Sequence, residues 1–443
     1  MGRFSGLSGL SGLSTVSVAM VALAGAVAFT VPASASPVSG AGDQATSSAV
    51  GAAFWAGQNA VGAVADAITA EVRKLPDEGG YAGLVTDPEK SAITVHWKGA
   101  VPAAVRQAAR GDRHVKVTFA EAPYTHRQLL DARDRAFAQR DQLPGKLTSV
   151  GPSPDGKGLI LGVAEDGGNA VGSRQSEAVA RDITDLTGGV AVVRVKSQNP
   201  QAATGTAVAA AGTSGRDTQQ AYGGARWTYW EGSDRYVCST GFAVRVPGSP
   251  WRLMTSAAHC GNQGTQAYSP QFPDSRAFGS VGHRDTERDI NLLYPGASDF
   301  FQPRMWWGPW AEASNAGDQR TWPVKGLHQN YVGQRVCSSG SQSGNICDIT
   351  IEATEQTVVY RDGTTVQRTV QVHKPNQAVW GSGDSGGPVS QPDGSDVYAN
   401  GIISGGTNDA QCEGKPNRSC GTTGWYAPLD IYLEKQGLEL VTG

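Results

Sequence analysis

The positions of the cysteines divide this chain of 443 residues into two unlike halves. All six cysteines lie between Cys238 and Cys420, and residues 36–200 contain none. An even number of cysteines in an exported chain indicates disulfides, here three. A zinc site would need closely spaced Cys/His pairs, and the sequence has no Cys-x-x-Cys pattern. We therefore expect a disulfide-bonded second half that holds no metal and no cofactor.

The first 35 residues have the features of an export signal. Arg3 precedes an apolar run, Val16 to Val31, and the small-x-small sequence Pro32-Ala33-Ser34-Ala35 follows it. The alternative is a transmembrane anchor, because the apolar run is close to spanning length. The small-residue cleavage site and the polar sequence after it favour a signal peptide over residues 1–35. We expect a secreted protein with no membrane attachment once the signal is removed.

The cysteine-free region, residues 36–200, contains a rough internal duplication. Each copy reads strand, strand, helix, strand: residues 83–119 in the first copy and 147–195 in the second. Helices are predicted over residues 51–75 and 124–141. No chemical motif surrounds the histidines of this region. The patterns predict an α+β domain without a catalytic site.

Residues 201–215 are dominated by Ala, Gly and Thr, which predicts a flexible, cleavable linker. Residues 216–443 show many short alternating strands separated by turn residues, for example 241–246 and 367–372, and end near a helix predicted over Leu429 to Gln436. The formal net charge of −3 gives no basic field for nucleic acid. The second half is therefore predicted to be an all-β sandwich or barrel.

One segment of the second half predicts a nucleophile: Gly381-Ser382-Gly383-Asp384-Ser385-Gly386-Gly387-Pro388. A serine hydroxyl needs a base to remove its proton and donors to receive the oxyanion that it creates. Glycines on both sides allow a tight turn in which successive N–H groups point at one spot. A plain turn between strands is the alternative, and the length of the motif argues against it.

Two further segments supply a base and a carboxylate. In Leu253–Cys260, an apolar strand end leads through small residues to His259, beside a cysteine that would hold its backbone. In Arg288–Leu293, Asp289 opens an apolar strand, where its carboxylate can be buried against an imidazole. Asp285 and Asp299 are rivals, but neither begins such a strand.

Together these segments resemble the chymotrypsin family of serine proteases, whose triad runs His, Asp, Ser along the chain. The likeness is closer to the secreted bacterial members, the streptogrisins and α-lytic protease, and covers residues 236–440. It is carried also by Cys238-Ser239-Thr240-Gly241-Phe242, by Val336-Cys337-Ser338-Ser339-Gly340 and by Ser404-Gly405-Gly406. The resemblance implies two six-stranded antiparallel β-barrels with a C-terminal helix and the active site between the barrels.

The resemblance also implies residue roles. His259, Asp289 and Ser385 would be the catalytic triad, with the backbone N–H groups of Gly383 and Ser385 as oxyanion hole. Ser404, Gly405 and Gly406 would pair with an extended substrate. The implied disulfides are Cys238–Cys260, Cys337–Cys347 and Cys412–Cys420.

The sequence departs from the family pattern at three places. Val379-Trp380 stands where members usually have a cysteine before the nucleophile motif. Ser338 stands where they often have an arginine that pairs with the residue equivalent to Asp384, so Arg335 is a candidate partner unless Asp384 is held in another way. The segment Phe300 to Trp310 looks like an insertion whose tryptophans either line a subsite or, as we favour, pack on the barrel. No further acidic residue lies close before Ser385, which favours apolar or small substrate side chains over Lys or Arg.

The function expected from the sequence is that of a secreted, monomeric serine endopeptidase acting on proteins or peptides. Residues 36–200 resemble, more faintly, the family's propeptides, which act as intramolecular chaperone and inhibitor; an accessory domain kept in the mature protein is the alternative. Residues 216–443 would be the protease domain, with a mature N-terminus near 205–225. Two other functions stay open: a catalytically inactive, protease-like binding module, and an esterase that uses the same triad.

Overall fold

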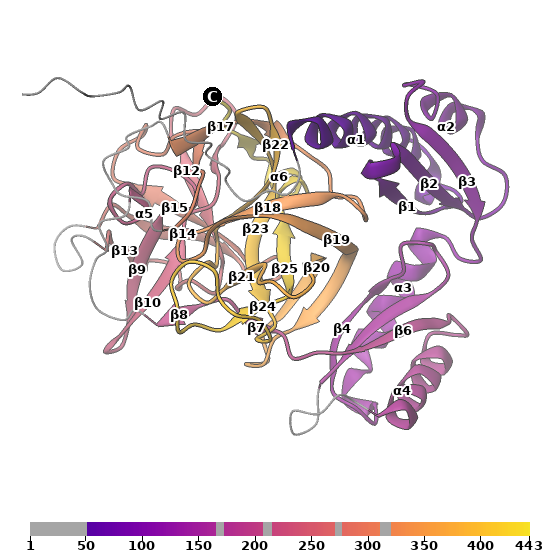
Figure 1. Ribbon diagram of the computed structural model, residues 1–443. Coiled ribbons are helices and arrows are strands. Elements are labelled where there is room, and N and C mark those ends of the chain that lie inside the picture. The colour runs from indigo at the N-terminus through magenta and orange to yellow at the C-terminus, as the bar shows by residue number, and fades with distance from the viewer. Residues whose placement is uncertain (1–50, 165–171, 207–214, 271–276, 311–319) are drawn as a thin grey trace, which may run out of the picture. The chain divides into compact units, whose positions relative to one another are not determined.

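The computed structural model describes residues 51–164, 172–206, 215–270, 277–310 and 320–443 (Figure 1). The expected signal peptide and residues 207–214 of the expected linker thus lie outside the described residues. All described residues belong to one compact unit. No helix among them is long and apolar enough to cross a bilayer.

The N-terminal region consists of two units with the predicted strand-strand-helix-strand order. In each unit the first two strands are antiparallel and the third is parallel to the second. The elements of the first unit are β1 (Tyr81–Asp87), β2 (Ala92–Trp97), α2 (Ala103–Ala108) and β3 (Lys116–Glu121). Those of the second are β4 (Leu147–Pro152), β5 (Leu159–Val163), α4 (Ser173–Leu186) and β6 (Val192–Ser197).

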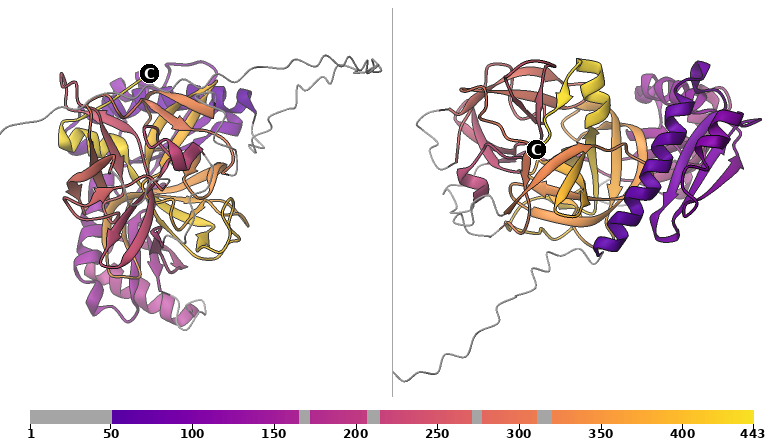
Figure 2. Two further views of the ribbon diagram at one scale, coloured as in Figure 1. Left: turned by 90° about the vertical axis from the view of Figure 1, so that its left-hand side faces the viewer. Right: turned by 90° about the horizontal axis from the view of Figure 1, so that it is seen from above.

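A longer helix packs on each of these sheets. The apolar residues Val61, Ala65 and Ile68 of α1 (Ala52–Val72) lie in one core with the first sheet, and Figure 2 shows α1 running along that sheet. Leu129, Ala132 and Ala136 of α3 (His126–Ala138) are spaced three or four residues apart and enter the core of the second sheet. Both helices fall within the predicted ranges.

The first sheet of the C-terminal half has six strands. Their order is β13 (Gln266–Ala267), β14 (Gly279–Asp285), β15 (Ile290–Pro295), β12 (Leu253–Ser256), β11 (Ala243–Arg245) and β26 (Glu439–Leu440). The hairpin of β9 (Arg226–Glu231) and β10 (Asp234–Ser239) joins it through a bridge between Thr228 and Tyr268. Alternate side chains such as Met254 and Leu293 fill the core of this barrel.

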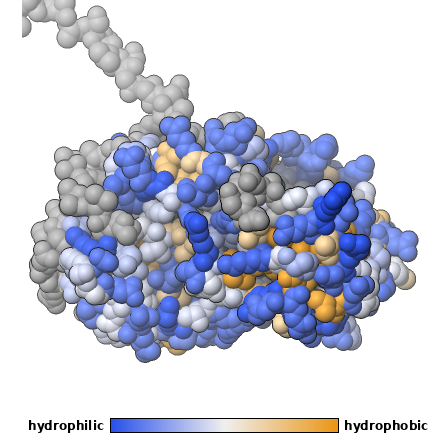
Figure 3. Space-filling model, turned by 90° about the horizontal axis from the view of Figure 1, so that it is seen from below, coloured by the Kyte–Doolittle hydropathy of each residue, from blue (hydrophilic) through white to orange (hydrophobic). Residues whose placement is uncertain are grey.

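Six strands of the second sheet close into a ring, because β22 pairs with both β23 and β18. Around the ring come β18 (Arg335–Gly340), β19 (Gly344–Val359), β20 (Thr365–His373), β25 (Thr423–Pro428), β23 (Asp396–Gly406) and β22 (Pro388–Asp393). The helix α6 (Leu429–Gln436) has the predicted bounds. The predicted fold class, two six-stranded barrels with a C-terminal helix after an α+β region, is confirmed. A face of mainly hydrophilic residues, with a smaller apolar group among them, is visible in Figure 3.

The chain between the two halves differs from the expected flexible linker. Gln201–Ala202 form β7, which pairs with Gly406 and Gly405 of β23. Gly205–Thr206 form β8, which pairs with Val237 and Tyr236 of β10. The composition of this segment predicts flexibility, but the partner strands supply its backbone hydrogen bonds. The segment is therefore extended and paired on both sides of residues 203–204.

Candidate active site

Ser385 lies in the turn between β21 (Trp380–Gly381) and β22 and is fully buried. Gly383 and Gly386 have φ angles of 94° and 82°, which side chains other than glycine rarely adopt. A Cβ atom on Gly386 would lie 2.3 Å from Ser256 Oγ and 2.5 Å from Ser239 O. The glycines that the sequence singled out are thus required by both the backbone conformation and the space around it.

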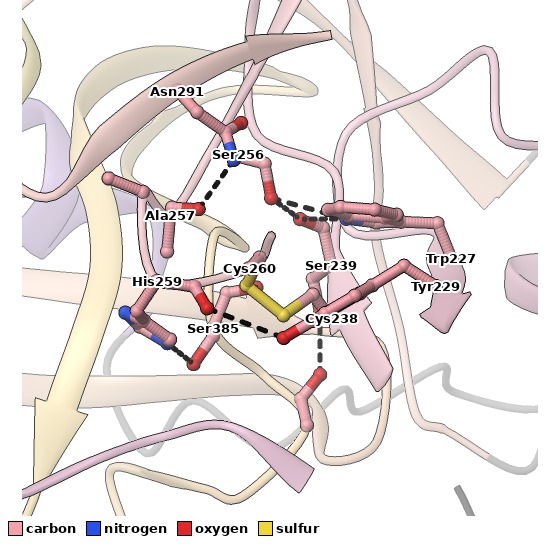
Figure 4. Close-up of a disulfide and its surroundings, with 12 residues drawn as sticks. Trp227, Tyr229, Cys238, Ser239, Ser256, Ala257, His259, Cys260, Asn291 and Ser385 are labelled. Carbon is pink, nitrogen blue, oxygen red and sulfur yellow. Dashed lines mark hydrogen bonds between the residues drawn. A yellow bond between two sulfur atoms is a disulfide. The ribbon is translucent and has the colours of Figure 1, made fainter. Parts of the chain in front are cut away.

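His259 follows β12 in a turn that three contacts hold in place (Figure 4). The disulfide Cys238–Cys260 joins the turn to β10. Asn291 Nδ2 donates a hydrogen bond to Ala257 O at 2.7 Å, and Tyr229 Oη donates to His259 O at 3.3 Å. The other two disulfides are Cys337–Cys347, between β18 and β19, and Cys412–Cys420.

Asp289 immediately precedes β15 and is buried, with a φ of 56°. A non-glycine residue in the left-handed region costs of order 1 kcal/mol, which the surrounding structure must offset. The rival carboxylates lie elsewhere: Asp285 pairs with Lys435 at 3.0 Å, and Asp299 is exposed. Asp289 is the one of the three that contacts His259.

The structure brings the side chains of His259, Asp289 and Ser385 together. His259 Nδ1 lies 2.8 Å from Asp289 Oδ2. On the other side of the ring, His259 Nε2 lies 2.7 Å from Ser385 Oγ (Figure 4). The backbone N–H of His259 also donates to Asp289 Oδ1 at 3.0 Å. In this arrangement the imidazole can accept the serine proton while the carboxylate holds the other ring nitrogen.

A hydroxyl pair behind Asp289 was not foreseen from the sequence. Ser404 Oγ donates to Asp289 Oδ2 at 2.5 Å, so Tyr360 Oη, 2.7 Å from Ser404 Oγ, is the donor to Ser404. Burial, together with the nearby Asp289 carboxylate, raises the pKa of Tyr360 well above its usual range. Ser404 was predicted only through its backbone, and Tyr360 lies in a segment without a motif.

The predicted substrate-binding groups contact the chain's own residues 201–203. Gly383 N–H donates to Ala203 O at 2.5 Å, and Ala203 N–H donates to Ser404 O at 3.1 Å. Gly405 and Gly406 pair with Ala202 and Gln201. The strand at Ser404–Gly406 and one of the two predicted oxyanion donors therefore hold a single extended peptide.

Similarity to known proteins was found in both sequence and structure. Streptogrisin-C of Streptomyces griseus is 33% identical over 216 residues, which are 48% of this chain and 40% of that protein. Over this stretch the chain is similar to a bacterial chymotrypsin-like serine protease. It spans less than half the length of this curated relative. No model of a known protein family matches it.

Two solved structures are also similar to the chain. Thermobifida fusca protease A is 30% identical, covering 50% of this chain and 98% of its own length with a TM-score of 0.37. The chymotrypsin of Cellulomonas bogoriensis is 25% identical, covering 50% of this chain and 99% of its own length with a TM-score of 0.35.

The partner of Asp384 differs from the one that the sequence suggested. Arg335 is not the partner of Asp384, because it pairs with Asp348 and Glu89. Instead Arg418 Nη1 lies 3.2 Å from Asp384 Oδ2, and the N–H groups of Gln342 and Ser343 donate to Asp384 Oδ1 at 2.8 and 3.0 Å. Arg418 was missed because it lies in the loop between Cys412 and Cys420, far from the expected position.

Two of the three tryptophans of the expected insertion, Trp306 and Trp307, pack on neighbouring aromatic side chains. Trp306 is buried, and its ring is nearly perpendicular to that of Tyr222, with the ring centroids 5.9 Å apart. Trp307 stacks on Trp322 with ring centroids 3.8 Å apart. Both contacts agree with the packing interpretation rather than with a substrate subsite.

Proposed function

We propose that this chain is a secreted serine endopeptidase that hydrolyses peptide bonds through an acyl-enzyme on Ser385. One observation carries the proposal: His259 lies within hydrogen-bond reach of Ser385 on one side and of Asp289 on the other. These are the distances that a nucleophile, its base and the group orienting that base require.

In the proposed mechanism, Ser385 Oγ attacks the carbonyl carbon while its proton moves to His259 Nε2. Asp289 accepts the Nδ1 hydrogen of His259 and stabilises the imidazolium that forms. The N–H groups of Gly383 and Ser385 receive the oxyanion, and a single donor of this kind is worth roughly 100- to 1,000-fold in rate. His259 then gives its proton to the leaving nitrogen, and water hydrolyses the ester.

We further propose that residues 36–200 are a propeptide that assists folding and blocks the site of the 216–443 protease domain. In support, residues 201–203 lie along Ser404–Gly406 and Ser385 is fully buried. The contacts of β4 with β19 tie the same region to the second barrel. Three disulfides favour an oxidising, extracellular location. A monomer acting on proteins or peptides is the form proposed.

A pair of substrates tests this function: a peptide anilide and a peptide ester with the same acyl group, given to the processed chain. We expect hydrolysis of both, with a loss of at least about 1,000-fold in Ser385→Ala. Hydrolysis of the ester alone would support the esterase instead. Turnover of neither substrate by a folded, processed chain would support an inactive binding module.

A further inference from the structure

We propose that the chain cleaves itself between Ala203 and Thr204, and that Trp380 restricts the site to substrates with an alanine-sized side chain before the cleaved bond. This inference rests on the proposed function and names the substrate class of the same site. It follows from how the segment 201–206 lies in the cleft and from what fills the space beside Ala203.

The register of the segment identifies the bond. The residues before the Ala203–Thr204 bond pair with β23. The last of them is Ala203, whose N–H donates to Ser404 O. Residues after it pair with β10, beginning with Gly205 opposite Val237. Between these two strand additions, Ala203 O accepts from Gly383 N–H, the predicted oxyanion donor. The carbonyl of Ala203 is therefore the group that a nucleophile at Ser385 would attack.

The space around Ala203 is nearly filled. Ala203 is buried, and the cavity beside it has a volume of only about 10 Å³. Its walls come from β21, from the end of β23 and from Ser419, next to the Cys412–Cys420 disulfide. A methyl group fits there, whereas a ring or a long chain has no room.

Trp380 fills the volume that a larger side chain would need. It is almost completely buried and shares an apolar cluster with Ala203. Its Nε1 donates to Gly405 O at 2.8 Å, which ties the indole to the strand that holds the substrate. A Cβ atom on Gly424 would lie only 2.1 Å from the ring, so the indole lies directly on that backbone. Trp380 cannot move deeper to admit a bulky residue.

The cleavage step balances as an ordinary acyl transfer. A bond forms between Ser385 Oγ and the Ala203 carbonyl carbon, and the Ser385 proton passes to His259. The bond from Ala203 to the Thr204 nitrogen then breaks, and that nitrogen takes the proton from His259. Water then hydrolyses the ester between Ser385 and Ala203, which leaves a new carboxylate on Ala203 and restores the Ser385 hydroxyl. The mature chain begins at Thr204, one residue before the window expected from the sequence.

The first test is the N-terminus of the full chain after processing, read by N-terminal sequencing and intact mass. We expect Thr204 in the wild type, an uncleaved chain in Ser385→Ala, and a processing rate unchanged by tenfold dilution. Ala203→Phe should slow processing at least 100-fold, whereas the matched variant Ala203→Gly should stay within tenfold of the wild type. Cleavage at another bond, or rapid processing of the Ala203→Phe variant at the same bond, would overturn the proposal.

A second test does not depend on variants that change the segment. Peptide anilides that differ only in the residue before the anilide are given to the processed wild type. We expect kcat/KM at least 100-fold higher for Ala than for Phe, and Trp380→Ala should raise the Phe value at least tenfold. A wild type that prefers Phe would overturn the role of Trp380 even if the variant failed to fold. Absence of any hydrolysis and of fluorophosphonate labelling would instead count against the proposed function itself.

Discussion

A line of hydrogen bonds runs behind Asp289, from Tyr360 through Ser404 to the carboxylate. Ser404 Oγ donates to Asp289 Oδ2, the same oxygen that lies 2.8 Å from His259 Nδ1, and Tyr360 Oη donates to Ser404. Ser404→Ala removes the direct donor and leaves the Ser404 backbone, the proposed substrate-binding group, in place. We expect kcat to fall about tenfold with KM within twofold, because a charge-assisted hydrogen bond contributes roughly 1.5–3 kcal/mol and part is recovered by water.

Ser390→Ala is the matched control for this measurement, made by steady-state kinetics on the processed chain. Ser390 is buried in the neighbouring strand β22, and its hydroxyl has no hydrogen-bond partner among the described residues. The Ser390→Ala variant should keep the wild-type kcat. Equal losses in both variants would mean that Ser404 acts only through packing.

Arg418 is expected to stabilise the nucleophile turn through Asp384, which is fully buried. Removing the cation leaves an uncompensated carboxylate, at a cost of about 3 kcal/mol. Arg418→Met should therefore lower the free energy of unfolding by that amount, measured with urea in a Ser385→Ala background. Arg335→Met removes a more exposed pair and should cost less than about 1 kcal/mol. A larger loss of stability in Arg335→Met than in Arg418→Met would support Arg335 as the partner of Asp384, as the sequence suggested.

The sequence predicted the side chains of His259, Asp289 and Ser385 because each lies in a short segment whose neighbours have a physical purpose. Glycines surround the serine, small residues and a cysteine surround the histidine, and an apolar strand follows the aspartate. Arg418 and Tyr360 have no such neighbours. Their positions depend on how a loop and a strand pack in three dimensions, which one sequence does not reveal.

At the scale of elements, β19 extends beyond its barrel and pairs with β4, so the N-terminal region shares a sheet with the second barrel. Arg133 of α3 supports this junction: its buried guanidinium donates to Glu355 O at 3.0 Å and lies 3.4 Å from Glu355 Oε2. Arg133→Gln should weaken retention of the cleaved N-terminal region about tenfold. The delay before peptidase activity appears after dilution measures how fast the proposed cleaved region dissociates.

Arg127→Gln on the same helix is the control, because Arg127 is exposed and pairs within α3, with Asp131 at 3.4 Å. The delay before activity appears in the Arg127→Gln variant should equal that of the wild type. If Arg133→Gln shows no shorter delay than Arg127→Gln, the β19 junction does not hold the N-terminal region.

The helix α6 and strands such as β11 and β20 lie where the sequence predicted them. The strands β7 and β8 were not predicted, because each has only two residues and the composition of residues 201–206 is that of a linker. Their extended form comes from β23 and β10, which are distant in sequence. Tertiary pairing overrides local preference here.

At the scale of the whole molecule, a cavity of about 250 Å³ is lined by both the N-terminal region and the second barrel. Asp430 of α6 faces it, with Arg73, Glu78 and Glu355 among the charged residues of its walls. Burial raises the pKa of Asp430 from 3.8 to about 6. The folded chain therefore binds this proton more tightly than the unfolded chain, and its stability falls as the pH rises through about 6.

Asp430→Asn should remove this pH dependence. In a Ser385→Ala background, we expect its free energy of unfolding to match that of the parent near pH 4 and to exceed it by about 1–3 kcal/mol near pH 7.5. Urea unfolding at both pH values measures the difference. Asp131→Asn, at an exposed carboxylate, should show no such gain. A variant that is less stable than its parent at pH 7.5 would contradict the effect of burial.

The most direct test of the account is the reaction of the processed chain with a fluorophosphonate, followed by mapping of the adduct by mass spectrometry. If His259 and Asp289 make the hydroxyl of residue 385 nucleophilic, one adduct should form, on Ser385, and His259→Ala should slow its formation at least about 1,000-fold. A folded, processed chain that gains no adduct on Ser385, or that reacts equally fast without the imidazole, would contradict it.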